Sequence, residues 1–148
     1  MLEQQINQEI KAAMLSKNEA RLRGLRAIKA AILLAKTEKG ATDSVSEDAE
    51  VKVLQKLAKQ RKESAEIYKT QNREDLYIIE IEELEVIEGF LPKQLSYEEV
   101  EAEIQAVIAS TGATSIKDMG KVMGLANKQL AGKADGKMIS EIVKQLLS

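Results

Sequence analysis

The sequence predicts an all-α protein, with an N-terminal domain of long helices followed by a tail of three short helices. Apolar residues recur at spacings of three and four, and Ala, Leu, Ile, Glu, Lys and Gln dominate the composition, as is typical of helices. The sole proline, Pro92, interrupts the helical pattern between Gly89 and Ser96. We therefore expect an N-terminal helical domain over residues 1–92 and a three-helix domain over residues 93–148.

The N-terminal domain should begin with two amphipathic helices. The first covers residues 2–16, where apolar side chains have helical spacing. Asn18 is a suitable N-cap for the second helix, which should run to about Lys39 and end at Gly40. Residues 40–46 carry no periodic signal, so we expect a loop there.

Two further helices should complete this domain. The third should end near Thr70. Its N-cap is either Ser44, which forms a capping-box pattern with Glu47, or Ser46. The fourth is expected over residues 73–88, because Asn72 followed by Asp75 suggests a break or cap. Its apolar side chains spread around most of the helix, so neighbours should cover it on more than one side.

Charged residues crowd the third and fourth helices. The first half of the third helix is basic, which indicates either a solvated face with glutamate partners or a surface for a polyanion. Adjacent glutamates on the fourth helix diverge by about 100°, which favours a solvated acidic face over acid–base or metal chemistry. These glutamates are Glu80, Glu82, Glu83, Glu85 and Glu88.

The tail should contain three short helices with clear starts and ends. The first begins with a capping-box pattern at Ser96 and ends at Gly112. The second covers residues 115–131, and Asp135 can cap the third. No segment alternates convincingly between apolar and polar residues, so no sheet is expected.

Two residue types are missing from the chain, which has no Cys and no His. Their absence excludes a Cys nucleophile, a Ser-His-Asp triad and zinc sites built on thiolates or imidazoles, and we expect no metal and no cofactor. With a net charge of −2, nucleic-acid binding would need a local cationic patch. No apolar run approaches the roughly 18 residues that span a bilayer, and the start does not resemble a signal peptide. A cytoplasmic location without membrane contact is therefore expected.

The second tail helix offers a candidate cationic face. At about 100° per residue, Lys117, Lys121 and Lys128 fall within roughly 40° of one another, opposite the apolar stripe. Gly120 and Gly124 border these lysines, although a glycine costs a helix interior about 1 kcal/mol relative to alanine. Close approach of another helix, or of a ligand's phosphate backbone, would compensate. The alternative is that the lysines confer only solubility and the glycines are packing notches or helix stops.

Two more lysines, Lys133 and Lys137, lie around the expected start of the last helix. Free backbone N–H groups and the helix dipole make such an end a natural anion site. From Gly112 onward, six lysines stand against three acidic residues, a local balance of +3. A phosphate-binding loop is excluded, because Ala131 and Met138 stand where that motif needs Gly and Ser or Thr.

Three blocks of the chain carry a resemblance to a known family: residues 59–64 with 72–76, residues 90–96, and residues 118–124 followed by 132–137. Together they resemble the YqeY-like family, which is related to the tail domain of the B subunit of tRNA-dependent Asp/Glu amidotransferase (GatB/YqeY). The resemblance extends over nearly the whole chain. The second and third blocks are specific at their mutual spacing.

The resemblance implies an all-helical protein in two parts, whose three-helix tail helps to hold the body of a tRNA. It implies tRNA contacts at Lys121, Lys128, Lys133 and Lys137, with glycines that permit close approach, and the helix-face geometry adds Lys117. The candidate nucleic-acid-binding residues are Lys117, Gly120, Lys121, Gly124, Lys128, Lys133 and Lys137.

At the family level, the resemblance also implies carbon–nitrogen ligase activity with glutamine as amido-N-donor. We find no residues that could perform this reaction alone. The prediction is therefore a non-catalytic tRNA-binding or amidotransferase-associated protein, with tRNA and the amidotransferase or aminoacyl-tRNA machinery as partners. The alternative is a helical protein–protein adaptor without nucleic-acid binding, in which Gly120 and Gly124 seat a partner helix.

Overall fold

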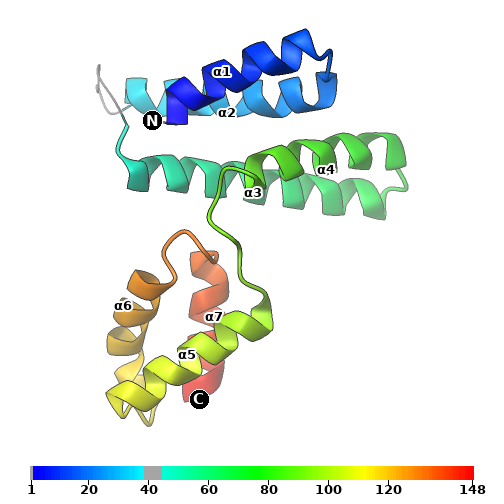
Figure 1. Cartoon of the computed structure of the whole chain (residues 1–148). Coiled ribbons are helices and arrows are strands. Elements are labelled where there is room, and N and C mark those ends of the chain that lie inside the picture. The colour runs from blue at the N-terminus through cyan, green and yellow to red at the C-terminus, as the bar shows by residue number, and fades with distance from the viewer. Residues whose placement is uncertain (1, 39–44) are drawn as a thin grey trace. The chain divides into compact units, whose positions relative to one another are not determined.

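The computed structural model describes residues 2–38 and 45–148, and all the regular structure within these ranges is helical (Figure 1). The prediction of an all-α fold is confirmed. The chain divides into two compact units, Met1–Leu91 and Pro92–Ser148, and each has its own cluster of buried apolar side chains. None of the described helices combines the length and the apolar character that crossing a bilayer requires.

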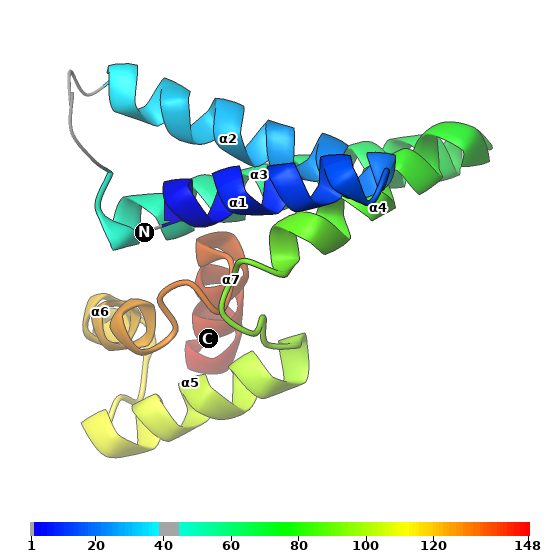
Figure 2. The same ribbon diagram turned by 45° about the horizontal axis from the view of Figure 1, so that its top comes forward.

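The first unit contains α1 (Leu2–Leu15), α2 (Glu19–Glu38), α3 (Glu47–Thr70) and α4 (Glu74–Glu88). Helices α1 and α2 form one antiparallel hairpin and α3 and α4 form another, as Figure 1 and Figure 2 show. Helix α2 packs against both helices of the second hairpin. The most deeply buried side chains of this unit are Ile6, Leu25, Ile28, Leu54 and Ile87.

Two helix starts in this unit follow predicted caps. Asn18 caps α2 by accepting a hydrogen bond from a backbone N–H three residues later, at 3.1 Å. Ser46 caps α3 by accepting a hydrogen bond from the Ala49 N–H at 3.2 Å. The rival cap Ser44 and the predicted end of the second helix lie within residues 39–44, outside the described residues.

Both hairpins turn through a non-glycine residue in the left-handed region, Lys17 with φ of 57° and Asn72 with φ of 56°. At each turn the left-handed residue donates its N–H to the carbonyl three residues earlier. The next residue donates to the carbonyl five residues earlier, which completes a Schellman motif. Helix α3 therefore ends at Thr70 as predicted, and α4 begins at Glu74, one residue later than predicted.

Helix α2 approaches α4 closely at Gly24. A Cβ atom at Gly24 would lie 2.7 Å from the Cβ of Val86, nearer than real Cβ atoms come to other atoms. Both residues are buried. The missing side chain therefore allows these two helices to pack, a contact that no sequence pattern predicts.

Ion pairs join the helices across the first unit. They connect α2 to α1, α2 to α4, and α3 to α4. The pairs are Arg21–Glu9, Lys36–Glu3, Arg23–Glu82, and Arg61 with both Glu83 and Glu80. Three glutamates of α4 are thus half-buried and paired, which corrects the expectation of a wholly solvated acidic face. Within the described part of the chain, no cluster of three or more acidic residues is suited to a metal.

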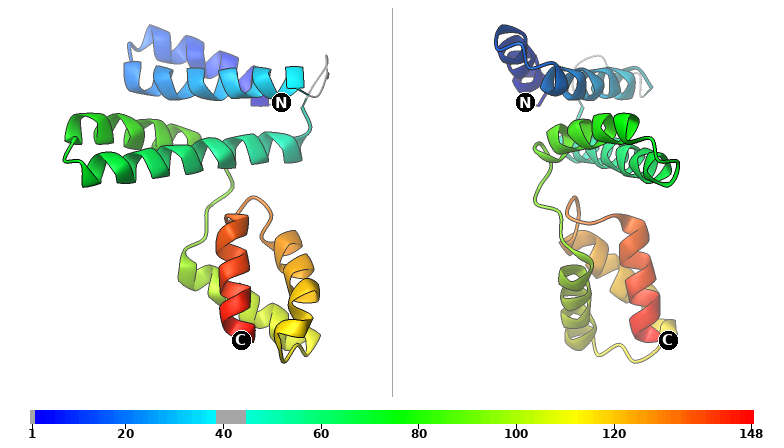
Figure 3. Two further views of the ribbon diagram at one scale, coloured as in Figure 1. Left: turned by 180° about the vertical axis from the view of Figure 1, so that it is seen from behind. Right: turned by 90° about the vertical axis from the view of Figure 1, so that its right-hand side faces the viewer.

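The second unit contains α5 (Tyr97–Thr111), the 3-10 turn η1 (Ile116–Asp118), α6 (Met119–Gln129) and α7 (Gly136–Leu147). Helices α6 and α7 lie side by side in opposite directions, and α5 packs against both, as Figure 3 shows. The most deeply buried side chains of this unit are Val100, Ile104, Val122, Ile142 and Val143.

The predicted capping box at the start of α5 is confirmed. The Ser96 hydroxyl accepts a hydrogen bond from the Glu99 N–H at 3.2 Å, and the Glu99 carboxylate accepts one from the Ser96 N–H at 3.3 Å. The bond from the Ser96 backbone N–H lowers the pKa of the Glu99 carboxyl, because it favours the charged form. The helix ends at Gly112 as predicted, with φ of 70°, a conformation that glycine adopts without strain.

The variant Gly24→Ala should lower the free energy of unfolding of the first unit by about 1–3 kcal/mol, because the added methyl group overlaps Val86. Urea denaturation followed by circular dichroism measures this. Gly24→Ala should cost less stability in a Val86→Ala background than in the native protein, because the smaller side chain at position 86 leaves room for the added methyl group. A gain in stability on Gly24→Ala, as in an open helix, would contradict the close contact.

Changing Glu80 to Gln and changing Glu83 to Gln should have different effects on stability. Burial raises the pKa of Glu80 above its usual 4.5, and Arg61, 3.9 Å away, opposes this only in part. Because folding raises the pKa of Glu80, its contribution to the free energy of unfolding is most favourable at a pH below the unfolded pKa. That contribution is lost as the pH rises through the folded pKa. At pH 7, Glu80→Gln should leave stability unchanged or raise it.

Glu83 provides the matched comparison, because it accepts a hydrogen bond from the Arg61 Nε at 3.0 Å. Glu83→Gln should lower the free energy of unfolding at pH 7 by about 1 kcal/mol, because a charge-assisted bond between half-buried groups is weakened. Denaturation of both variants at pH 7 gives the comparison. Equal losses in the two variants would show that Glu80 is stabilising when ionised.

Candidate nucleic-acid interface

The seven candidate residues lie in the second half of the C-terminal unit. Lys117 lies in η1, Lys133 in the α6–α7 loop and Lys137 in the first turn of α7, whereas α6 carries Gly120, Lys121, Gly124 and Lys128. All five lysine side chains are exposed. None of them forms a hydrogen bond or an ion pair with another described residue.

Two of these lysines share one side of α6. Lys121 and Lys128 are separated by seven residues, which places them about 20° apart around the helix and about 10 Å apart along its axis. The core side of the same helix is marked by Val122 and Ala126, which have no exposed surface. The predicted separation of a lysine side from an apolar side therefore holds within α6.

Lys117 does not belong to α6 itself. In place of one helix over residues 115–131, the structure has η1 over Ile116–Asp118 and then α6 over Met119–Gln129. A 3-10 turn advances about 120° per residue because it has three residues per turn. The α-helical count that placed Lys117 close to Lys121 is therefore wrong for this turn.

Hydrogen bonds at this turn explain the difference. The Ser115 hydroxyl accepts a hydrogen bond from the Lys117 N–H at 3.4 Å, and the Asp118 carboxylate accepts one from the Thr114 N–H at 3.1 Å. These bonds span two and four residues and hold a tight first turn. Ile116, predicted to belong to the apolar stripe, is 48% exposed as a result.

Gly120 and Gly124 face open space. A Cβ atom at either glycine would meet no atom within 4 Å, whereas one at Gly24 would overlap Val86. Within the described residues of the C-terminal unit, neither α6 glycine is thus a packing notch. Since glycine inside a helix costs about 1 kcal/mol relative to alanine, the described residues offer no internal compensation at Gly124.

The α6–α7 loop is held by the segment that precedes α5. The backbone N–H of Leu95 donates to the Lys133 carbonyl at 2.9 Å, and the Gln94 side-chain amide donates to the Gly132 carbonyl at 2.7 Å. Gly132 has φ of 77°, which favours glycine. Two sequence blocks that carry the family resemblance meet here and fix the backbone from which Lys133 projects.

The N-terminus of α7 already holds a carboxylate. Asp135 caps the helix as predicted, by accepting a hydrogen bond from the Lys137 N–H at 3.3 Å. Its negative charge interacts favourably with the helix dipole. The predicted anion site at this helix end is therefore occupied by the chain's own side chain. Anion binding here would depend on the exposed side chains of Lys133 and Lys137.

These observations define a small all-helical protein whose C-terminal three-helix unit presents unpaired lysines. The chain belongs to the YqeY-like family, whose model, described as Yqey-like protein, matches residues 3–147. A related protein from Pyrenophora tritici-repentis, named Altered inheritance of mitochondria protein 41, mitochondrial, is 30% identical over 141 residues. The match covers 94% of this chain and 77% of the relative.

The variant Gly124→Ala should raise the stability of the C-terminal unit by about 1 kcal/mol, because alanine favours a helix interior and its methyl group meets open space. Thermal unfolding of the full chain measures the change. Ala126→Gly, two residues along the same helix, should lower stability and serves as the control. A loss of stability on Gly124→Ala would show that the space is filled.

Proposed function

We propose that this protein is a non-catalytic tRNA-binding module that acts with amidotransferase or other aminoacyl-tRNA machinery. The proposed contact residues, here called the lysine face, are Lys121 and Lys128 on one side of α6, with Lys117 in η1 and Lys133 and Lys137 around the start of α7. The observation that carries the proposal is that these five exposed side chains have no carboxylate partner among the described residues and lie in a stretch with twice as many lysines as acidic residues. Family membership supports it through the related amidotransferase tail.

The local charge balance differs between the two parts of the chain. In the first unit, four arginines and one lysine form ion pairs with acidic side chains: Arg21, Arg23, Lys36, Arg61 and Arg73. Exposed lysines of the same unit, such as Lys52, Lys56 and Lys62, form none among the described residues. In the second unit, the lysine face adds to a local balance of +3 from Gly112 onward. Uncompensated positive charge attracts phosphates over the distance of a Debye length, so this part of the chain is the better site for a polyanion.

The α6 glycines support the same surface. Gly120 and Gly124 leave open space on an exposed part of α6, so a ligand backbone can approach the helix more closely than any side chain would allow. Lys121 and Lys128 border that part of the helix on one side. Contacts to phosphates fix position without reading sequence, which fits recognition of the body of a tRNA.

The proposal that the protein is not itself catalytic is supported by the reactive side chains that it lacks. The chain has no Cys and no His, and its described acidic residues form no metal cluster. We infer that carbon–nitrogen ligase activity with glutamine as donor belongs to the machinery that this protein assists. Purified protein incubated with glutamine, ATP and mischarged tRNA should release no ammonia. Ammonia release above that of a heat-denatured sample would overturn this half.

The variant Lys121→Glu/Lys133→Glu/Lys137→Glu should bind tRNA more weakly and with a shallower salt dependence. Each lysine–phosphate contact contributes roughly −0.7 to −0.9 to the slope of log K against log salt, because counterions are released. The slope should therefore become shallower by about one for each lysine removed. Gel shifts at several salt concentrations measure both quantities.

The matched control changes three exposed lysines of α3 and alters the net charge equally: Lys52→Glu/Lys56→Glu/Lys62→Glu. This variant should bind tRNA within about twofold of the native protein, because long-range charge is largely screened at moderate salt. Equal losses in the two triple variants would show a general charge effect. Unaltered binding in the first variant would exclude the lysine face.

A second candidate function is a protein–protein adaptor. The same part of the chain exposes two apolar side chains, Ile116 at 48% and Leu125 at 38%, close in sequence to the open glycines. Small residues beside apolar ones suit close packing of a partner helix. A partner protein that stays bound after nuclease treatment, and is lost on Gly124→Leu, would favour the adaptor over tRNA binding.

A further inference from the structure

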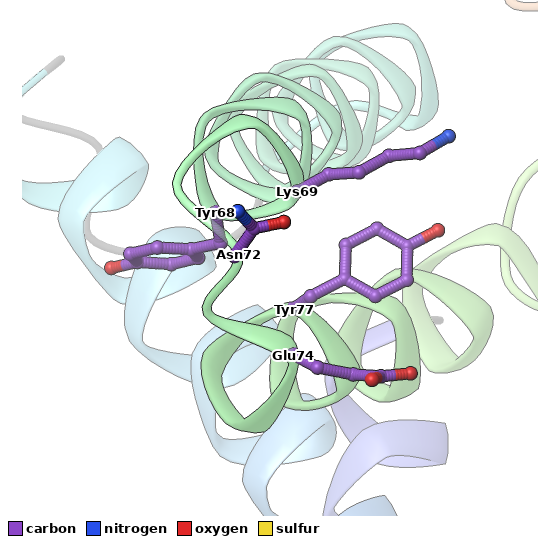
Figure 4. Close-up of a pocket in the computed structure, with 5 residues that line it drawn as sticks. All are labelled: Tyr68, Lys69, Asn72, Glu74 and Tyr77. Atoms are coloured by element: carbon purple, nitrogen blue, oxygen red, sulfur yellow. The ribbon is translucent and has the colours of Figure 1, made fainter.

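A surface pocket of about 330 Å³ lies at the α3–α4 turn, well away in sequence from the lysine face (Figure 4). Tyr68 and Lys69 line it from the end of α3, Asn72 from the turn, and Glu74 and Tyr77 from the start of α4. Two of the three tyrosines of the chain are therefore gathered at one turn. Its size is within the range of pockets that bind small molecules.

The backbone of the turn fixes these residues. The Asn72 N–H donates to the Lys69 carbonyl at 3.2 Å, the Arg73 N–H to the Tyr68 carbonyl at 2.9 Å, and the Tyr77 N–H to the Arg73 carbonyl at 2.9 Å. Asn72 has φ of 56°, where glycine would be less strained. The hydrogen bonds of the turn thus hold a side-chain amide at the pocket, in a backbone conformation that Asn adopts more readily than most residues.

The polar groups of the pocket have no partner in the described chain. No hydrogen bond or ion pair involves the Asn72 amide, the hydroxyls of Tyr68 and Tyr77, the Lys69 amine or the Glu74 carboxylate. In Figure 4 the side chains of Lys69, Tyr77 and Glu74 extend the same way, the Tyr68 ring extends the opposite way, and the Asn72 amide lies between the two rings. Donors, acceptors and the ring of Tyr77 are therefore available to one ligand.

We propose that this pocket binds an unpaired adenine, either in a free nucleotide or in single-stranded RNA. The phenol ring of Tyr77 can stack on a base, and the amide of Asn72 can bond the N6 amino group and N7 of adenine together. The Glu74 carboxylate is a second acceptor for an exocyclic amino group, and the Lys69 amine can contact a phosphate. Uracil lacks the amino group, so it is the matched poor ligand. The pocket does not depend on the lysine face.

The first experiment titrates the full chain with AMP and UMP, and with short single-stranded oligoadenylate and oligouridylate. Tyrosine fluorescence reports binding directly, because the chain has no Trp. Each adenine ligand should bind at least about tenfold more tightly than its uracil counterpart if the amide pairs with the base. Oligoadenylate binding without AMP binding would assign the site to RNA, and similar binding of both would assign it to the nucleotide unit.

The second experiment uses Asn72→Gly, which removes the amide and suits the left-handed turn. This variant should fold and should lose the preference for adenine. Lys17→Gly, at the equivalent position of the α1–α2 turn, makes the same backbone change without touching the pocket and should keep the preference. Tyr77→Leu keeps the apolar bulk and should weaken all four ligands by about tenfold, through loss of stacking.

Two results would overturn the proposal. One is equal binding of the adenine and uracil ligands by the native protein. The other is an unchanged adenine preference in Asn72→Gly. The triple variant of the lysine face should bind AMP as the native protein does. Loss of tRNA binding and loss of adenine binding are therefore separate outcomes. Failure of the tRNA proposal would not decide whether the pocket binds adenine.

Discussion

Pro92 separates two hydrophobic cores, and the rest of the structure depends on that separation. Phe90 and Leu91 pack on the first core, and Leu95, three residues after the proline, packs on the second. A proline lacks the N–H that a helix interior needs and disfavours helix at the residue before it, so one helix cannot run through. Each core is therefore closed by its own helices. With aromatics at 3%, both cores depend on aliphatic side chains and on close helix contacts such as that at Gly24.

Local signals predicted most helix ends, whereas tertiary contacts could not be predicted. The capping box at Ser96 and the helix end at Thr70 are confirmed. Both could be predicted because each motif involves atoms only a few residues apart. Gly24 looks like a residue that weakens a helix until Val86 is placed against it. Likewise, the glutamates of α4 look solvated from periodicity alone, because the sequence does not show which arginines will face them across the helix pair.

The candidate site was predictable to the extent that it lies within one regular helix. Lys121 and Lys128 share a side because both belong to α6. Lys117 lies in a 3-10 turn, and apolar residues spaced by three fit such a turn as well as they fit the first turn of an α-helix. The pocket at Asn72 was missed because its residues come from both sides of a turn. One sequence feature could have indicated the pocket: two tyrosines lie at similar distances before and after an asparagine between two predicted helices.

The uneven pairing of charge has a consequence for how the molecule responds to its medium. In the first unit, arginine–glutamate pairs attract one another across three helix contacts, and added salt screens that attraction. From Gly112 onward, lysines outnumber acidic residues, but the four glutamates of α5 bring residues 92–148 to seven lysines and seven acidic residues. The second unit therefore has no net charge whose repulsion salt could screen. Raising the ionic strength should lower the stability of the long-helix half and change that of the other half much less. Concentrated salt would then loosen one half of the molecule and remove a polyanion from the other.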